Sequence, residues 1–166
     1  MKLAIVAAIA IAAAPLARAE TVCEEVARIN ESALERFDNI KGPYLPGRSA
    51  DEVSESDATL FGGYDCVIDQ YFEAVHACTW AFETEADLLA AYAAKSAAIA
   101  PCFAGWNKDD LLVHDPSAPG QRTLAGVGYL DPPGAYELIV WAIIAEIDPA
   151  QDSGRYRLVI QTTDYN

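Results

Sequence analysis

Residues 63–106, GYDCVIDQYFEAVHACTWAFETEADLLAAYAAKSAAIAPCFAGW, hold three of the four cysteines of this 166-residue chain and decide its fold. Cys66 and Cys78 lie in two runs that are typical of β-strands. In the second run, every second residue falls on one face, because strand side chains alternate. That face is the expected core face and consists of Phe72, Ala74, His76, Cys78, Trp80 and Phe82.

A helix is predicted directly after this second strand. Thr84 is the expected N-cap, with Asp87 at the third helical position, a pairing that satisfies free backbone N–H groups at a helix start. Apolar residues then recur at helical spacing up to Cys102, and the predicted buried stripe is Leu88, Leu89, Tyr92, Ile99 and Phe103.

Upstream, the sequence predicts a first helix over residues 21–40. Thr21 and Glu24 form a capping-box pair at its start, and Gly42-Pro43 ends it. One face is apolar throughout: Val22, Val26, Ile29, Ala33, Phe37 and Ile40. Residues 42–58 contain prolines, glycines and several carboxylates without sustained periodicity, which predicts a surface loop.

The strands come in two groups, one before the second helix and one after it. They are predicted at 59–68 and 71–82, then at 122–130, 137–147 and 155–163, with turn residues between the last three. Consecutive strands with short connections favour antiparallel pairing. The predicted fold class is therefore α+β, an antiparallel sheet of about five strands with two helices packed on one face and stapled by disulfides.

The first nineteen residues, MKLAIVAAIAIAAAPLARA, have a basic start, an apolar run and a small-x-small ending. This layout predicts a signal peptide, 1–19, cleaved after Ala19, because signal peptidase accepts small side chains there. We expect a single domain over 20–166, exported to the periplasm or the extracellular space. No later segment is long and apolar enough to suggest a membrane span.

Four cysteines, Cys23, Cys66, Cys78 and Cys102, in an exported chain predict two disulfides. A zinc site is the competing interpretation, but the chain has no C-x-x-C pair, and the spacings of His76 and His114 match no compact zinc motif. The second helix returns about 25 Å along the sheet, past Cys78. A hairpin turn, expected at residues 69–71, would place Cys66 near Ala74, within reach of Cys102. These lengths favour Cys66–Cys102 with Cys23–Cys78, and Cys78–Cys102 is the main rival.

Catalytic motifs are missing from the sequence: there is no G-x-S-x-G, no H-E-x-x-H and no glycine-rich phosphate loop. His114 and Asp115 are adjacent in a turn-rich segment. With Asp109 and Asp110 they form the candidate metal patch, because carboxylate and imidazole groups are ligands for divalent ions. His76 is expected to be a hydrogen-bonded core residue. No catalytic residue and no cofactor is predicted.

The formal net charge is −14, and removal of Lys2 and Arg18 with the signal peptide would leave 9 basic against 25 acidic residues, or −16. Such a charge repels nucleic acid and attracts a basic protein partner. The leading prediction is a non-enzymatic domain, of an inhibitor or immunity-like kind, that binds another protein through its acidic surface or an exposed sheet edge. The alternatives are a periplasmic small-ligand or metal-binding protein and a hydrolase that uses carboxylates. The sequence does not set the oligomeric state.

Overall fold

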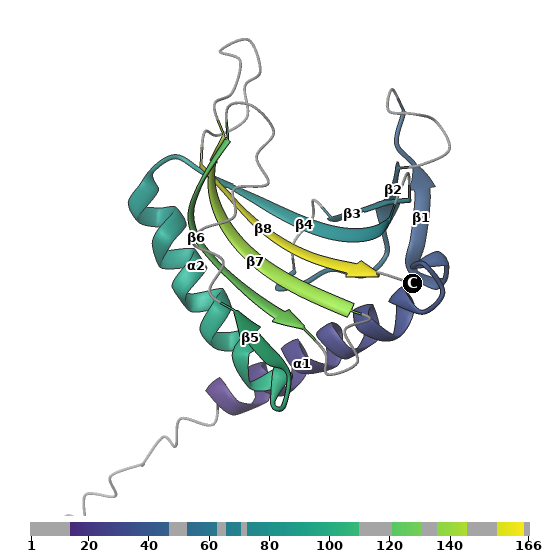
Figure 1. The fold of residues 1–166 in the computed structure, drawn as a ribbon, viewed down its shortest axis with the longest axis horizontal. Coiled ribbons are helices and arrows are strands. Elements are labelled where there is room, and N and C mark those ends of the chain that lie inside the picture. The colour runs from purple at the N-terminus through teal and green to yellow at the C-terminus, as the bar shows by residue number, and fades with distance from the viewer. Residues whose placement is uncertain are drawn as a thin grey trace, which may run out of the picture.

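The described part of the chain folds into one antiparallel sheet of eight strands, crossed on one face by two helices (Figure 1). The computed structural model describes residues 14–46, 53–62, 66–70, 73–109, 121–130, 136–145 and 156–164. The strand order across the sheet is β1-β2-β3-β4-β8-β7-β6-β5. The strands are β1 Lys41–Tyr44, β2 Val53–Ser56, β3 Cys66–Asp69, β4 Ala74–Phe82, β5 Asn107–Asp109, β6 Gln121–Leu130, β7 Tyr136–Ala145 and β8 Tyr156–Asp164.

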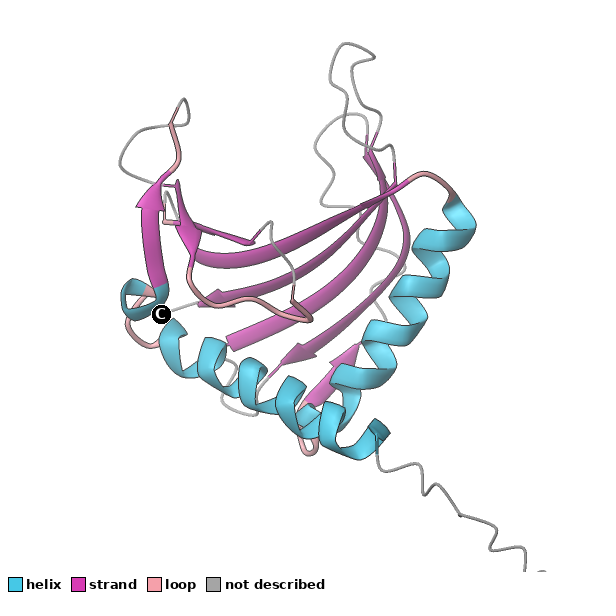
Figure 2. Ribbon diagram, turned by 180° about the vertical axis from the view of Figure 1, so that it is seen from behind, coloured by secondary structure: helices cyan, strands magenta, loops and turns pink. Residues whose placement is uncertain are grey.

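The predicted α+β class is confirmed, and each of the five predicted strands has a counterpart, namely β3, β4, β6, β7 and β8. The sheet is strongly curved, and both helices lie on the same side of it, meeting in a V (Figure 2). Alternation along β4 follows the prediction as far as Cys78: Ala74, His76 and Cys78 are buried, whereas Val75 and Ala77 are partly exposed. Trp80 and Phe82, also predicted on the core face, are only partly buried and pack against the edge of the core. The helices therefore cover the face that carries Cys78.

The prediction of a loop over 42–58 is wrong at residues 42–44, which belong to β1, and at β2. Val53 and Ser54 of β2 are buried, and β2 pairs antiparallel with β3. The backbone hydrogen bonds of this pairing stabilise β2 as a strand. The carboxylates in and around β2 are the reason why the sequence pattern did not indicate a strand there. β5 was likewise not predicted; it adds three residues beside β6 at the opposite edge.

The first helix, α1, spans Ala14–Ala33, so it begins and ends earlier than predicted. Thr21 therefore lies inside the helix and is not its N-cap. After α1 the chain turns sharply: Arg36 and Phe37 have φ angles of 53° and 64°, and Phe37 N–H donates to the Ser32 carbonyl at 2.8 Å. A left-handed conformation is unfavourable for a bulky residue. At Phe37 the full burial of the side chain offsets this cost.

The second helix, α2, spans Glu85–Ile99 and has the predicted cap. The Thr84 hydroxyl oxygen accepts a hydrogen bond from Asp87 N–H at 3.1 Å. Leu88, Ile99 and Phe103 are buried as predicted, with Phe103 in the short 3₁₀ helix η2, Ala100–Phe103. Leu89 is not part of the buried stripe, since its side chain is 37% exposed.

Two disulfides are present, but the favoured pairing is wrong: the bonds are Cys23–Cys102 and Cys66–Cys78. The error lies in the register of the hairpin. A turn at residues 69–71 would place Cys66 near Ala74, whereas the longer connection between β3 and β4 places Cys66 directly opposite Cys78. Their Cα atoms are 4.0 Å apart. Cys102 instead lies beside α1, with 5.1 Å between its Cα atom and that of Cys23.

The two bonds close loops of very different length, 79 and 12 residues. We expect the Cys23→Ala/Cys102→Ala variant to lose about 4 kcal/mol of unfolding free energy, because the longer loop removes more entropy from the unfolded chain. The matched Cys66→Ala/Cys78→Ala variant should lose about 3 kcal/mol. Urea denaturation of both variants measures the difference. A larger loss for the short loop would contradict this entropic account.

Candidate functional site

The candidate metal patch predicted from the sequence falls mostly outside the described residues. Asp109 is the last residue of β5, and only its backbone is described. Asp110, His114 and Asp115 lie outside the described residues. The patch therefore stays a prediction.

A different group of potential metal ligands lies beneath the helices. Cys66, His76 and Cys78 are all buried, and the one ligand atom each residue offers lies within 4.8 Å of the other two. His76 and Cys78 share a face because they are two residues apart on β4, and Cys66 joins them because β3 places it opposite Cys78. Among the residues with described side chains, this is the one group of three or more such ligands.

The hydrogen bonds of His76 identify its tautomer. Its Nε2 atom lies 3.1 Å from the Ala58 carbonyl oxygen and 3.1 Å from Ser56 Oγ. A carbonyl oxygen accepts hydrogen bonds and cannot donate them, so Nε2 carries the proton. Nδ1 is then unprotonated, and it is buried without a hydrogen-bond partner. The prediction of a hydrogen-bonded core histidine is confirmed at Nε2, and the bare Nδ1 is an additional finding.

The connection between β2 and β3, which contains the Ala58 carbonyl that accepts the hydrogen bond of Nε2, contacts both helices. Ala58 and Leu60, in the connection between β2 and β3, are buried, and the following Phe61 N–H donates to Glu25 Oε2 on α1 at 3.2 Å. Lys95 of α2 lies over the Phe61 ring, with its Nζ atom 4.2 Å from the ring centroid. The Ala58 carbonyl is thus supported by contacts from α1 and α2.

Burial lowers the pKa of His76 below its ordinary value of 6.5, while the hydrogen bond with Ala58 opposes this effect. Below that ordinary value, the unfolded chain binds a proton more readily than the folded one. We expect the unfolding free energy of the oxidised protein to fall as the pH drops below 6.5. The contribution of one proton is at most about 1.4 kcal/mol per pH unit.

Urea denaturation across this pH range, compared with His76→Gln, isolates the effect. The Gln side chain keeps a donor for Ala58 but does not titrate. The difference in stability between the two proteins should shrink as the pH falls. The same pH dependence in both proteins would contradict the assignment to His76.

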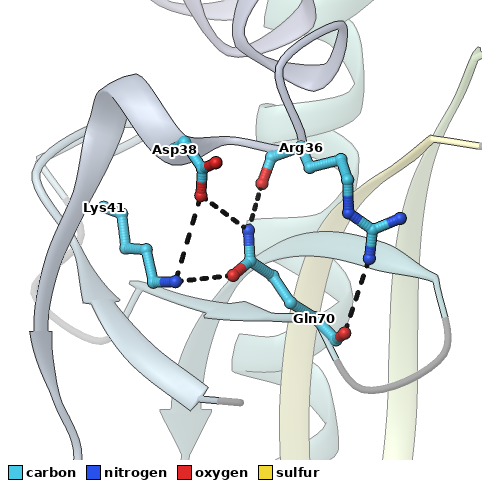
Figure 3. Close-up of polar contacts among 4 residues, drawn as sticks. All are labelled: Arg36, Asp38, Lys41 and Gln70. Carbon is cyan, nitrogen blue, oxygen red and sulfur yellow. Dashed lines mark hydrogen bonds and ion pairs between the residues drawn. The ribbon is translucent and has the colours of Figure 1, made fainter. Parts of the chain in front are cut away.

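A second polar cluster fastens the end of α1 to the hairpin between β3 and β4 (Figure 3). The Gln70 side chain is its centre: Nε2 donates to the Arg36 carbonyl and, at 3.1 Å, to Asp38 Oδ1, while Oε1 accepts from Lys41 Nζ at 2.6 Å. Arg36 Nη2 also lies 3.5 Å from the Gln70 carbonyl oxygen. These bonds stabilise the turn that holds Arg36 and Phe37 in the left-handed region.

We expect Gln70→Ala to lower the unfolding free energy by about 1–2 kcal/mol, because three side-chain hydrogen bonds are lost at a partly exposed site. Gln70→Glu is the matched control, since it keeps the acceptor for Lys41 but loses the donor to Arg36 and adds charge beside Asp38. Its loss should be at least as large. Thermal or urea unfolding measures both, and an unchanged stability for Gln70→Glu would show that the donor contributes little.

Five aromatic residues could line a ligand groove, Tyr44, Trp106, Tyr129, Tyr136 and Trp141, and some of them are accounted for by packing. Tyr129 is buried and stacks on Phe103, with 4.6 Å between ring centroids, and Trp106 packs edge-on against the same ring at 4.7 Å. Tyr44 is 50% exposed and carries Lys41 over its ring. Nothing is described of the side chains of Tyr136 and Trp141.

The outward face of α2 is exposed and almost entirely apolar. Apart from Glu85 and Asp87 in the first turn, its exposed residues are Ala86, Leu89, Ala90, Ala93, Ala94 and Ala97. We call these six residues the α2 outer face. Lys95, the one basic residue of the helix, leans away over the rings of Phe61 and Trp80, at 4.2 Å from each centroid.

No protein-family model matches this chain, and comparisons with curated proteins and with solved structures found no match. Among its described residues, the chain also has no helix whose length and apolar character would suit a membrane crossing. The class that the structure itself defines is an α+β domain with one antiparallel sheet and two disulfides.

Sequence reasoning missed the proximity of Cys66, His76 and Cys78. One signal is present in the sequence, the His76-x-Cys78 spacing on a strand face, but an ordinary core face has the same spacing. The position of the third residue, Cys66, depends on the register of the hairpin between β3 and β4. The predicted element lengths gave the wrong register.

Proposed function

We propose that this chain is an exported, non-enzymatic domain that binds another protein through the α2 outer face. The observation that carries the proposal is the uncharged, exposed surface of a helix whose opposite side is already buried. Leu88 and Ile99 are fully buried against the sheet, so α2 is apolar on both sides. Helices that are apolar all round are normally covered on all sides, and exposed apolar patches commonly mark protein interfaces.

Charge suggests the chemistry of the partner. Glu83, Glu85 and Asp87 are exposed at the start of α2, next to the α2 outer face, and the whole chain has a net charge of −14. A basic protein would be drawn toward this end of the helix, because opposite charges accelerate encounter and orient the partners. An inhibitor or immunity-like protein that neutralises a basic enzyme is one concrete form of this function.

The sheet edges are less suited to the same task. The two edge strands, β1 and β5, have four and three residues, and β1 contains Pro43, which lacks a backbone N–H. Short edge strands and proline are features that discourage strand addition by another chain. The helix face therefore has better support than strand addition at an edge.

Export is supported by the predicted signal peptide together with the two disulfides, since such bonds persist in oxidising compartments. The alternative of a metal-binding protein has one specific site in its favour, the buried group formed by Cys66, His76 and Cys78. A carboxylate hydrolase has no comparable support.

Affinity capture from envelope extract of the source cell at low ionic strength tests the interface. A basic protein should bind the mature, oxidised chain, and high salt should weaken the complex. Ala90→Arg/Ala94→Arg, on the α2 outer face, should abolish capture, because two charges are placed in the apolar contact. Ala27→Arg, at an exposed position of α1, is the control and should still capture the partner. Equal capture by all three proteins would contradict the proposed face.

A further inference from the structure

We propose that Cys66, His76 and Cys78 form a thiol-gated zinc site, closed while the disulfide is intact and able to bind Zn²⁺ once it is reduced. The three residues supply two sulfurs and an imidazole, and their ligand atoms already lie within 4.8 Å of one another. Thiolate and imidazole are the preferred ligands of zinc in proteins. This proposal is independent of the protein-binding function.

The hydrogen bonding of His76 is the main evidence for a ligand. Metal-binding histidines usually donate the N–H of the nitrogen that does not bind the metal to a backbone carbonyl or a carboxylate, which fixes the tautomer and aims the other nitrogen. Here Nε2 donates to the Ala58 carbonyl at 3.1 Å, and Nδ1 is left unprotonated, buried and without a partner. A buried lone pair without a donor is costly, and either a thiol S–H or a metal ion would satisfy it.

The surroundings of His76 hold this arrangement in place. Ser56 Oγ donates to the Ala58 carbonyl at 2.9 Å and accepts from Ala58 N–H at 3.1 Å, so the acceptor is fixed locally. The centroid of the Phe37 ring lies 6.0 Å from the centroid of the imidazole ring. The ring is thereby fixed with respect to the strands that carry the two sulfurs.

Electroneutrality favours a divalent ion. The site is buried, with Cys66 at 5% exposure and His76 and Cys78 at 0%. Two thiolates and a neutral imidazole carry a charge of −2, so Zn²⁺ would make the buried group neutral, whereas a monovalent ion would leave a net negative charge in the core. The three protein ligands leave the fourth tetrahedral position of zinc for water or another small ligand.

The gating step is thiol–disulfide exchange with a dithiol reductant. The reductant gives two electrons and two protons to the Cys66–Cys78 bond, which breaks to form two thiols, and the reductant leaves as its own disulfide. Zn²⁺ then displaces the two thiol protons as the thiolates bind it. The second disulfide, Cys23–Cys102, belongs to no such group of metal ligands among the described residues. It therefore serves as an internal control for the effect of reduction alone.

The test uses the mature chain reduced with a phosphine without oxygen, then titrated with zinc chloride against a chromogenic chelator. We expect one zinc per reduced chain and none for the oxidised chain. Cobalt chloride should give a thiolate-to-cobalt charge-transfer band. His76→Gln should weaken zinc binding by about tenfold or more, since it removes one of three ligands.

Two double variants assign the site. Cys23→Ser/Cys102→Ser should keep the zinc affinity of the reduced parent, and Cys66→Ser/Cys78→Ser should lose it. Far-UV circular dichroism keeps the test decisive if reduction unfolds the chain, because zinc should then restore the folded spectrum. Failure of zinc to bind or to refold the reduced chain would overturn the proposal. So would full affinity in His76→Gln, or loss of affinity in Cys23→Ser/Cys102→Ser.

Discussion

The pairing of β4 with β8 is the interaction on which the rest of the structure depends. The sheet consists of two antiparallel halves, β1 to β4 and β5 to β8, and this one ladder joins them over nine residue pairs from Ala74–Asp164 to Phe82–Tyr156. Cys78 lies opposite Ile160 and Trp80 opposite Leu158, so the ladder also aligns the core side chains under the helices. Neither disulfide crosses between the two strands. The junction therefore relies on backbone hydrogen bonds and on burial beneath the helices.

Periodicity was sufficient to predict most of the fold. Alternation on β4, the Thr84 cap of α2 and the turn residues between the last three strands led to the correct class, because each of these signals acts over a few residues. The short strands β1, β2 and β5 were missed because their stability comes from neighbouring strands and not from their own residues. The start and end of α1 were also misplaced. There, the buried Phe37 continues the helical spacing although its backbone has already left the helix.

For the candidate sites, too, the features set by neighbouring residues could be predicted, and those set by contacts distant in the sequence could not. A strand face containing His76 and Cys78 can be recognised in the sequence, but the position of Cys66 depends on the length of a hairpin connection. An error of a few residues there moved the cysteine to a different partner. The many alanines of α2 are visible in the sequence, but the α2 outer face was not predicted, because which residues are exposed depends on how the helix lies on the sheet.

The central position of β8 has a consequence for the order in which the molecule can assemble. β8 follows every other strand of the sheet in the chain, yet it lies in the middle, between β4 and β7. Until β8 arrives, β4 presents an unpaired edge, the kind of surface that pairs with other chains and leads to aggregation. The contacts that complete the core span almost half the sequence, which slows folding because long loops must close first. A chain of this topology gains its cooperative stability only after its last strand has been delivered.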